Sequence, residues 1–259
     1  MILDKKVKPK FETAVYRSDD TGYAVASNMN AFFKVDFQNS TCEFIHFFED
    51  ENPRGEDLYT SILPFGKDYL LIPGAANNLI IYNPEKDTYK KINVHTGKMS
   101  PWHDYAKYSD AIIFENKIIL VPERYSYVTI VDPNTSKVEF IDIGVEDSTW
   151  KRRGTWIEGG IFKTVANNSP RMLTYNMRTK KPLVQDSYSE KKVLPKLKEV
   201  EKNKVDYSEM DFELLGDLDS YWKSVFETFE KHGTVQVKEE DKWLSFEDMT
   251  QYVEWKKAK

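Results

Sequence analysis

Residues 126–143, SYVTIVDPNTSKVEFIDI, contain an apolar run, a polar turn with Asp132 and Pro133, and a second apolar run. Residues 77–94, NNLIIYNPEKDTYKKINV, follow the same plan, with Asn83 and Pro84 at the turn. Asp and Asn side chains cap turns, and Pro presets the backbone angle φ that a turn requires. The two stretches therefore predict two β-hairpins of one design.

The same hairpin recurs elsewhere in the chain. We call the acidic or amide residue that follows each apolar strand the anchor. The anchors are Asp36, Asn83, Asp132 and Asn176, at spacings of 47 (36 to 83), 49 (83 to 132) and 44 (132 to 176) residues. A second landmark lies ten residues before each anchor: Ala26, Pro73, Pro122 and Ala166. Two landmarks in fixed phase indicate an internal repeat.

Each repeat contains four strand-sized pieces rich in β-branched and aromatic residues and bounded by turn residues. In the second repeat they are residues 59–65, 69–73, 78–83 and 88–94, and in the third 110–116, 117–122, 127–132 and 137–143. No helical periodicity interrupts residues 11–190. Four antiparallel strands at this period predict a mainly β protein, a β-propeller of four-stranded blades with four recognisable repeats.

In strand order and length, the repeats resemble those of kelch-like and WD-type propeller proteins over about residues 11–190. They carry neither the paired glycines of kelch repeats nor the Trp-Asp dipeptide of WD repeats, so the resemblance implies an architecture and no activity. Propellers hold about 4–8 blades. A ring of four could close alone, take a blade from another segment, or stay open and associate as a homo-oligomer.

The composition changes after residue 190. We interpret residues 1–190 as the propeller-like repeat domain, residues 191–213 as a charged linker and residues 214–259 as an α-helical tail. Both tail helices are expected to pack through one apolar face, because an isolated amphipathic helix must bury that face.

Two helices are expected in this tail. In the first, apolar residues recur at helical spacing, Asp217 or Asp219 can cap the start, and Gly233 can end the helix. The apolar residues are Leu218, Trp222, Val225 and Phe229. The second begins with Ser245, three residues before Asp248, a pattern similar to a capping box.

Charge and cysteine content exclude several classes of protein. The formal net charge is -5, from 37 Lys+Arg against 42 Asp+Glu, which argues against a nucleic-acid partner. No apolar run approaches membrane-spanning length, so we expect no membrane partner. Cys42 is the only cysteine, which precludes an intramolecular disulfide, and it lies in an apolar strand where a core position is expected. We expect a cytoplasmic protein.

The strand phase places the loops between second and third strands, and the crossings between blades, at one end of the blades. This end is the ligand side of propellers by analogy of fold. Candidate ligand-binding residues there are Asn77, Asn78, Trp102, His103, Asp104, Arg124, Trp150, Arg152, Arg153, Asn167 and Arg171. Aromatic rings stack on sugars, and guanidinium groups bind carboxylate or phosphate in a bidentate manner. The alternatives are amides that serve only loop conformation and tryptophans that wedge between blades.

These residues predict a non-catalytic binding or interaction propeller that recognises a protein or a carbohydrate-like, anionic ligand, with no cofactor. His46, His95 and His232 show no metal-ligand spacing, so no metal site is expected. The alternative is an enzyme acting on a carbohydrate or a phosphate-containing substrate, through His103 and Asp104 or through a carboxylate pair drawn from Asp104, Glu123 and Glu158. A third alternative is an assembly subunit that associates through its tail helices.

Overall fold

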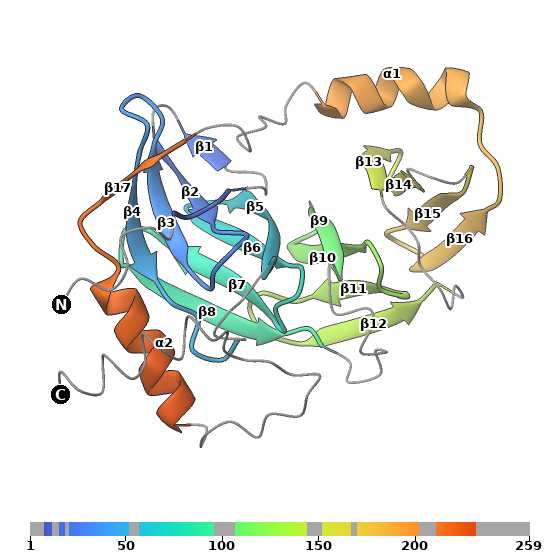
Figure 1. Ribbon diagram of the computed structural model, residues 1–259. Helices are drawn as coiled ribbons and strands as arrows, with labels where there is room; N and C mark the ends of the chain where they lie inside the picture. Colours follow the sequence, from blue (N-terminus) through green and yellow to red (C-terminus); the bar gives the residue numbers. More distant parts are fainter. Residues whose placement is uncertain are drawn as a thin grey trace, which may run out of the picture. The chain divides into compact units, whose positions relative to one another are not determined.

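The computed structural model describes residues 8–11, 16–18, 21–51, 57–95, 107–143, 152–166, 170–201 and 211–231. The chain divides into two compact units, residues 1–58 with 206–259, and residues 59–205, and each is described by itself. Both units are built mainly from antiparallel strands (Figure 1). Within the described residues, no helix is both long and apolar enough to cross a membrane.

The unit of residues 59–205 contains three four-stranded sheets, which we call blades 2, 3 and 4. Blade 2 contains β5 (Tyr59–Phe65), β6 (Asp68–Pro73), β7 (Asn78–Asn83) and β8 (Thr88–Asn93). Blade 3 contains β9 (Tyr108–Phe114), β10 (Lys117–Pro122), β11 (Tyr127–Val131) and β12 (Val138–Asp142). Blade 4 contains β13 (Arg152–Glu158), β14 (Ile161–Ala166), β15 (Met172–Asn176) and β16 (Lys181–Gln185). In each sheet, strands that follow one another in the chain pair antiparallel.

The other unit contains blade 1, with β1 (Tyr16–Ser18), β2 (Thr21–Val25), β3 (Phe32–Asp36) and β4 (Thr41–His46). A fifth strand, β17 (Glu213–Leu215), adds to β4 in parallel, with Leu214 opposite Cys42. The edge of blade 1 is therefore covered by a segment from far along the chain. Covering an edge in this way blocks its open hydrogen-bonding groups from pairing with another chain. With these sheets, the predicted fold class of four antiparallel four-stranded blades is confirmed.

The anchor residue has one structural role in all four blades. The Oδ1 atom of Asp36 accepts from the backbone N–H of Asn39 at 3.0 Å. The equivalent bonds run from Lys86 to Asn83 at 2.9 Å, from Thr135 to Asp132 at 3.3 Å and from Thr179 to Asn176 at 3.0 Å. This side-chain cap fixes the turn between the third and fourth strands. The sequence repeat is therefore a repeat of turn geometry.

The backbone of the same turn is also repeated. The residue four positions after each anchor lies in the left-handed region, with φ of 53°, 50°, 59° and 56°. These residues are Ser40, Asp87, Ser136 and Lys180. A left-handed residue ends the turn with the twist that the two strands need. The third and fourth strands thus enter the same register in every blade.

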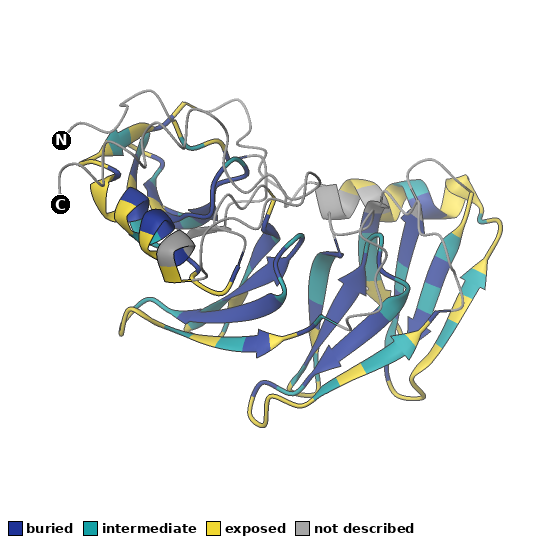
Figure 2. Ribbon diagram, turned by 60° about the horizontal axis from the view of Figure 1, so that its bottom comes forward, coloured by how far each residue is buried: buried dark blue, intermediate teal, exposed yellow. Residues whose placement is uncertain are grey.

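Between blades, the apolar side chains form two cores in the unit of residues 59–205. One core joins blades 2 and 3 through residues such as Leu70, Ile81 and Leu120. The other joins blades 3 and 4 through residues such as Val128, Ile130 and Leu173. The central strands of blades 2 and 3 are buried on both faces, whereas the outer strands β8, β12 and β16 carry exposed positions (Figure 2). Blade 3 is therefore held from both sides.

The segment of residues 191–213, interpreted from the sequence as a charged linker, contains most of a helix and the start of a strand. Helix α1 (Glu190–Glu201) occupies its first half, and Val193, 5% exposed, packs on Val165 of blade 4. β17 begins at the end of the same segment. The Lys/Glu-rich composition and Pro195 inside the helix are typical of linkers, so the narrow apolar stripe of α1 gave little signal in the sequence.

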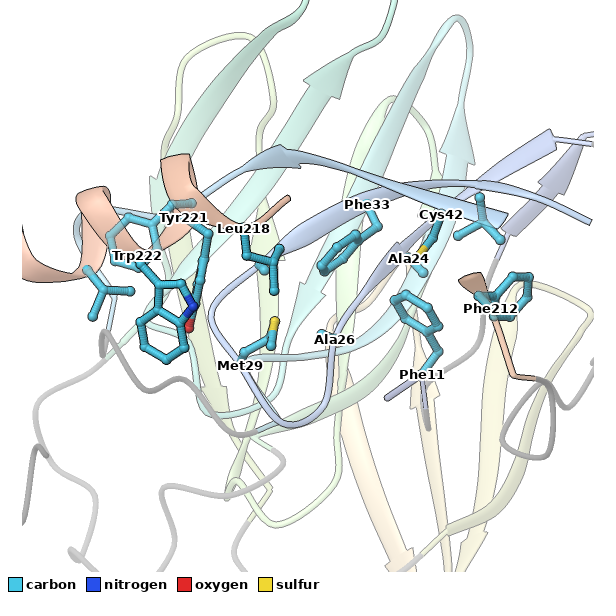
Figure 3. Close-up of a cluster of buried hydrophobic side chains, with 14 of the residues drawn as sticks. Phe11, Ala24, Ala26, Met29, Phe33, Cys42, Phe212, Leu218, Tyr221 and Trp222 are labelled. Atoms are coloured by element: carbon cyan, nitrogen blue, oxygen red, sulfur yellow. The ribbon is translucent and has the colours of Figure 1, made fainter. Parts of the chain in front are cut away.

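The first predicted tail helix is confirmed as α2 (Asp219–Lys231). The Oδ1 atom of Asp217 accepts from the backbone N–H of Asp219 at 3.0 Å, a cap at the expected place. Tyr221, Trp222, Val225 and Phe226 are buried in the core of blade 1 (Figure 3). Burying each such side chain stabilises by roughly 1.5–3 kcal/mol. The helix expected from Ser245 onward lies outside the described residues.

Substitution of Asp132 tests the two roles of the anchor. Asp132 caps the turn and also pairs with Lys117 at 2.5 Å, which holds the pKa of its carboxyl well below the usual value. Asp132→Asn keeps a capping oxygen, as Asn83 and Asn176 do, and loses only the ion pair. Asp132→Ala loses both. We expect the melting temperature to fall from the wild type to the Asn variant and further to the Ala variant.

The pH dependence separates the two roles. A lowered pKa in the folded state stabilises above the unfolded-state pKa of about 3.9, and this contribution is lost as the pH falls through the folded-state value. The difference between wild type and Asp132→Asn should therefore be present at neutral pH and shrink below about pH 4. Thermal unfolding followed at several pH values measures both effects. A wild-type advantage that persists unchanged at low pH would contradict the ion-pair role.

Candidate binding face at the loop end of blades 2 to 4

Equivalent loops of blades 2, 3 and 4 emerge at one end of the sheets. They join β6 to β7, β10 to β11 and β14 to β15, and the crossings from β8 to β9 and from β12 to β13 start and finish at the same end. We call this the loop end and the opposite one, which carries the anchor turns, the turn end. At the turn end, Lys180 pairs with Glu139 at 2.5 Å and Lys90 donates to the Pro133 carbonyl at 2.6 Å. These bonds join blade 4 to blade 3 and blade 2 to blade 3. The anchor turns of the three blades therefore lie at the same end of the unit.

A buried lysine organises the loop end. Lys107 is 1% exposed, and its Nζ atom donates to the carbonyl oxygens of Ala75 at 2.7 Å and Ala76 at 3.2 Å. Its backbone N–H donates to Gly74 at 3.1 Å, and its carbonyl accepts from Glu123 at 2.9 Å. Lys107 therefore ties the end of one crossing to the β6–β7 loop and to the β10–β11 loop.

Tyr108, the next residue, adds a second tie below the loops. Its hydroxyl lies 3.2 Å from the Val94 carbonyl and 2.7 Å from Thr129 Oγ1. Burial raises the pKa of Tyr108 well above the usual value, so the phenol stays neutral. Its ring meets that of Tyr125 edge-on, with centroids 5.3 Å apart. Tyr108 thus supports the framework of the loop end and is not poised for proton transfer near neutral pH.

Sequence reasoning missed Lys107. A lysine beside a predicted strand is ordinarily solvated, and almost none is fully buried. Its burial becomes understandable only when two carbonyls of a loop 31 and 32 residues away turn toward it. No local pattern carries that signal.

Of the predicted site residues, the structure brings Asn77, Asn78, Arg124 and Arg171 to the loop end. Asn78 is 9% exposed and starts β7, paired with Asn93, and the Asn77 carbonyl accepts from Val94 at 2.9 Å. Both Asn residues thus help to build the loop. Arg171 is exposed and its Nε lies 3.3 Å from a carboxylate oxygen of Asp186. Arg124 is half-buried on the β10–β11 loop.

Arg152 and Arg153 belong to a strand and not to a crossing. They open β13, where the register shifts between Arg152 and Gly154. A bulge of this kind places an extra residue, here Arg153, in one strand without a partner in the neighbouring strand. Trp156 lies farther along the same strand and packs with the cluster around Val193 of α1, not at the loop end.

Several predicted residues lie outside the described part of the chain. They are Trp102, His103, Asp104, Trp150 and Asn167, and the side chains of Arg152 and Arg153 are not described either. The catalytic alternative built on His103 and Asp104 therefore stays a prediction.

The carboxylates of the catalytic alternative do not all meet. Glu123 lies at the loop end, whereas Glu158 is the last residue of β13 at the turn end and pairs with Lys163 at 2.6 Å. The seven-residue strand that separates the two ends spans roughly 20 Å. A carboxylate pair of Glu123 with Glu158 is therefore wrong.

Two further kinds of site were considered in the described residues, a metal site and a reactive thiol at Cys42. Within them, no cluster of three or more His, Cys, Asp or Glu side chains has the geometry to hold a metal ion. Cys42 is 1% exposed in the core of blade 1, which confirms the predicted core position. Burial raises the pKa of its thiol to about 11. At neutral pH this thiol is protonated, and a protonated thiol is a poor nucleophile.

Comparison with known proteins supports the fold. No protein-family model matches the chain, and no curated protein does. A streptogramin B lyase structure matches with a TM-score of 0.50 and 10% identity, over 70% of this chain and 56% of that one. A catalytically inactive virginiamycin B lyase from Staphylococcus aureus, solved with quinupristin, matches with a TM-score of 0.52 and 10% identity, over 71% and 58%.

The matched region covers less than two thirds of either lyase chain. At this identity the likeness shows a shared fold, that of a β-propeller type protein, and carries no activity across. The prediction of propeller-type blades made from the repeats is confirmed.

Substituting Lys107 tests its role at the loop end. Lys107→Met leaves two buried carbonyls without their donor, which costs about 1–3 kcal/mol of unfolding free energy. Lys67→Met is the matched control, because Lys67 is exposed at the turn end and its Nζ lies 3.5 Å from Glu85. Urea unfolding should place the control within about 0.5 kcal/mol of the wild type. Equal stability of the two variants would refute the role of Lys107.

Proposed function

We propose that the chain is a non-catalytic binding propeller that recognises an anionic partner, a protein segment or a carbohydrate-like ligand, at the loop end of blades 2 to 4. The observation that carries the proposal is that equivalent loops of three blades emerge at this end, with Arg124 on one and Arg171 on another. A propeller fold fits a binding role, because its loops can vary while the blades stay rigid.

Charge supports an anionic partner. Guanidinium groups hold carboxylate, sulfate or phosphate oxygens through paired N–H donors, and they are less strongly hydrated than ammonium groups. Arg152 and Arg153 begin β13 and so add two more arginines to the same end of blade 4. The whole chain carries 37 Lys+Arg against 42 Asp+Glu, so arginines at one end of the blades do not follow from a general excess of basic residues.

Rigidity supports binding as well. The bonds of Lys107 and Tyr108 hold the β6–β7 loop, the β10–β11 loop and the start of β9 in one arrangement. A binding surface that is organised before the ligand arrives loses less conformational entropy when the complex forms. Buried structural groups beneath polar exposed ones are the usual construction of such a surface.

A binding screen with charge variants tests the proposal. The probes are an array of uronic-acid and sulfated oligosaccharides and a set of Asp/Glu-rich peptides, and the neutral forms of both serve as references. Two double variants remove the loop-end charge: Arg124→Ala with Arg171→Ala, and Arg152→Ala with Arg153→Ala. The control is Arg178→Ala, because Arg178 is exposed at the turn end of the same blade and its Nε lies 3.9 Å from Glu115.

We expect each loop-end double variant to weaken binding of the selected probe by at least about tenfold, equivalent to 1.4 kcal/mol, with an unchanged melting temperature. The control should bind within about twofold of the wild type. A glycan hit or a peptide hit decides which ligand class is recognised. Equal affinity of the loop-end variants and the control would refute the proposed site.

A further inference from the structure

The two faces of a blade can be distinguished by residue position. In blade 3, Ile118 and Leu120 belong to the core shared with blade 2, whereas Ile119 and Val121 belong to the core shared with blade 4. We call the first the preceding face and the second the following face. Because side chains alternate along a strand, the position relative to the anchor assigns every central-strand residue to one face.

The following face of blade 4 differs from those of blades 2 and 3. One cross-strand pair lies at the same position in each: Leu70 with Ile81, Ile119 with Ile130, and Lys163 with Thr174. The first two pairs are buried against the next blade. Lys163 and Thr174 are only partly buried, and Lys163 pairs with Glu158 on this face. Burying a charged residue at the centre of an interblade contact would cost free energy, because the charge would lose its hydration. This part of the face is therefore suited to contact with solvent and not to packing against another blade.

A helix covers the apolar remainder of this face. Val165 and Met172, opposite each other on β14 and β15, pack with Val193 of α1. Trp156 and Tyr188 border the same cluster. The following face of blade 4 is thus divided between a helix and a solvated polar strip.

The preceding face of blade 1 is covered in an analogous way. Ala24, Phe33 and Val35 occupy the positions that in blades 3 and 4 contact the preceding blade. Here the covering residues come from the segment of residues 211–231 (Figure 3). Phe212 meets Phe11 edge-on at 5.5 Å, and Tyr221 meets Phe44 at 5.9 Å. Trp222, Val225 and Phe226 fill the rest of the cluster, each 6% exposed or less.

We propose that α1 and the segment of residues 211–231 are caps that take the place of a neighbouring blade on the following face of blade 4 and the preceding face of blade 1. Arrays of repeats need atypical ends, because an inner repeat would expose an apolar face there. In this chain the ends are made by helices of the C-terminal third and by the change of an apolar pair to Lys163 and Thr174. Neither the following face of blade 4 nor the preceding face of blade 1 then accepts a further blade, from this chain or from a second copy.

Cysteine labelling tests the cap on blade 4. In a Cys42→Ala background, Thr174→Cys places a thiol on the following face and Thr164→Cys places one on the preceding face, where Thr164 is fully buried. A maleimide should react with the native Thr174→Cys variant within about tenfold of its rate with the urea-unfolded chain. It should react at least about 100-fold more slowly with Thr164→Cys. If Thr164→Cys does not fold, Thr129→Cys replaces it, because Thr129 is also fully buried.

Equal protection of the Thr174→Cys and Thr164→Cys thiols would overturn the proposal, because it would mean that a blade covers this face. The measurement is made at several protein concentrations, so that a blade supplied by a second copy would appear as protection that grows with concentration.

The native thiol reports on the cap of blade 1. Cys42 lies on the covered face, opposite Leu214 of β17. The double variant Phe212→Asp/Val225→Asp should release the cap and raise the labelling rate of Cys42 at least about tenfold. The control double variant, Asp211→Lys/Lys223→Asp, changes exposed positions of the same segment and should label like the wild type.

A second thiol distinguishes release of the cap from global unfolding. With Thr164→Cys added to the cap variant, that thiol in the other unit must stay protected while Cys42 reacts. If Cys42 stays protected although circular dichroism shows that α2 is lost, another element covers the face, and the cap proposal is overturned.

Discussion

The hydrogen bond from a turn amide to the anchor side chain is the interaction on which the rest of the structure depends. It fixes where the third strand of each blade ends and where the fourth begins. Since successive side chains of a strand point to opposite faces, a shift of one residue would exchange the two faces of the sheet. The cap therefore decides which side chains meet the blade before and which meet the blade after. Interblade cores, end faces and loop positions all follow from that choice.

The same constraint places the candidate binding face. With the anchor turns at one end of blades 2 to 4, the loops between second and third strands must emerge at the other. Lys107 and Tyr108 then connect the β6–β7 loop and the start of β9 with the β10–β11 loop, which carries Arg124. Buried Asn78 and Lys107 build the loop end, whereas Arg171 is exposed there and pairs with Asp186.

Much of the fold could be predicted from the sequence, because β-strand alternation and turn chemistry are local. The anchors, the strands of blades 2 and 3, and α2 with its Asp217 cap were all recognisable in short windows. Features that depend on distant partners were not. α1 has one narrow apolar stripe in a Lys/Glu-rich run, and β17 has only three residues. Lys107 is buried because two loop carbonyl oxygens accept hydrogen bonds from its ammonium group. The strand phase placed Asn77, Asn78, Arg124 and Arg171 at the loop end, but the roles of Asn78 and Trp156 in building the fold required the coordinates.

Hydrogen exchange at the anchor turns tests the central claim most directly. The amides of Asn39, Lys86, Thr135 and Thr179 lie in exposed turns, yet each donates to an anchor oxygen. We predict that these four amides exchange at least about tenfold more slowly than the same residues in an unstructured peptide, and that they do so in every blade. Exchange at peptide rates in the four turns would show that the anchors do not set the strand register, and the assignment of faces and ends would then lose its basis.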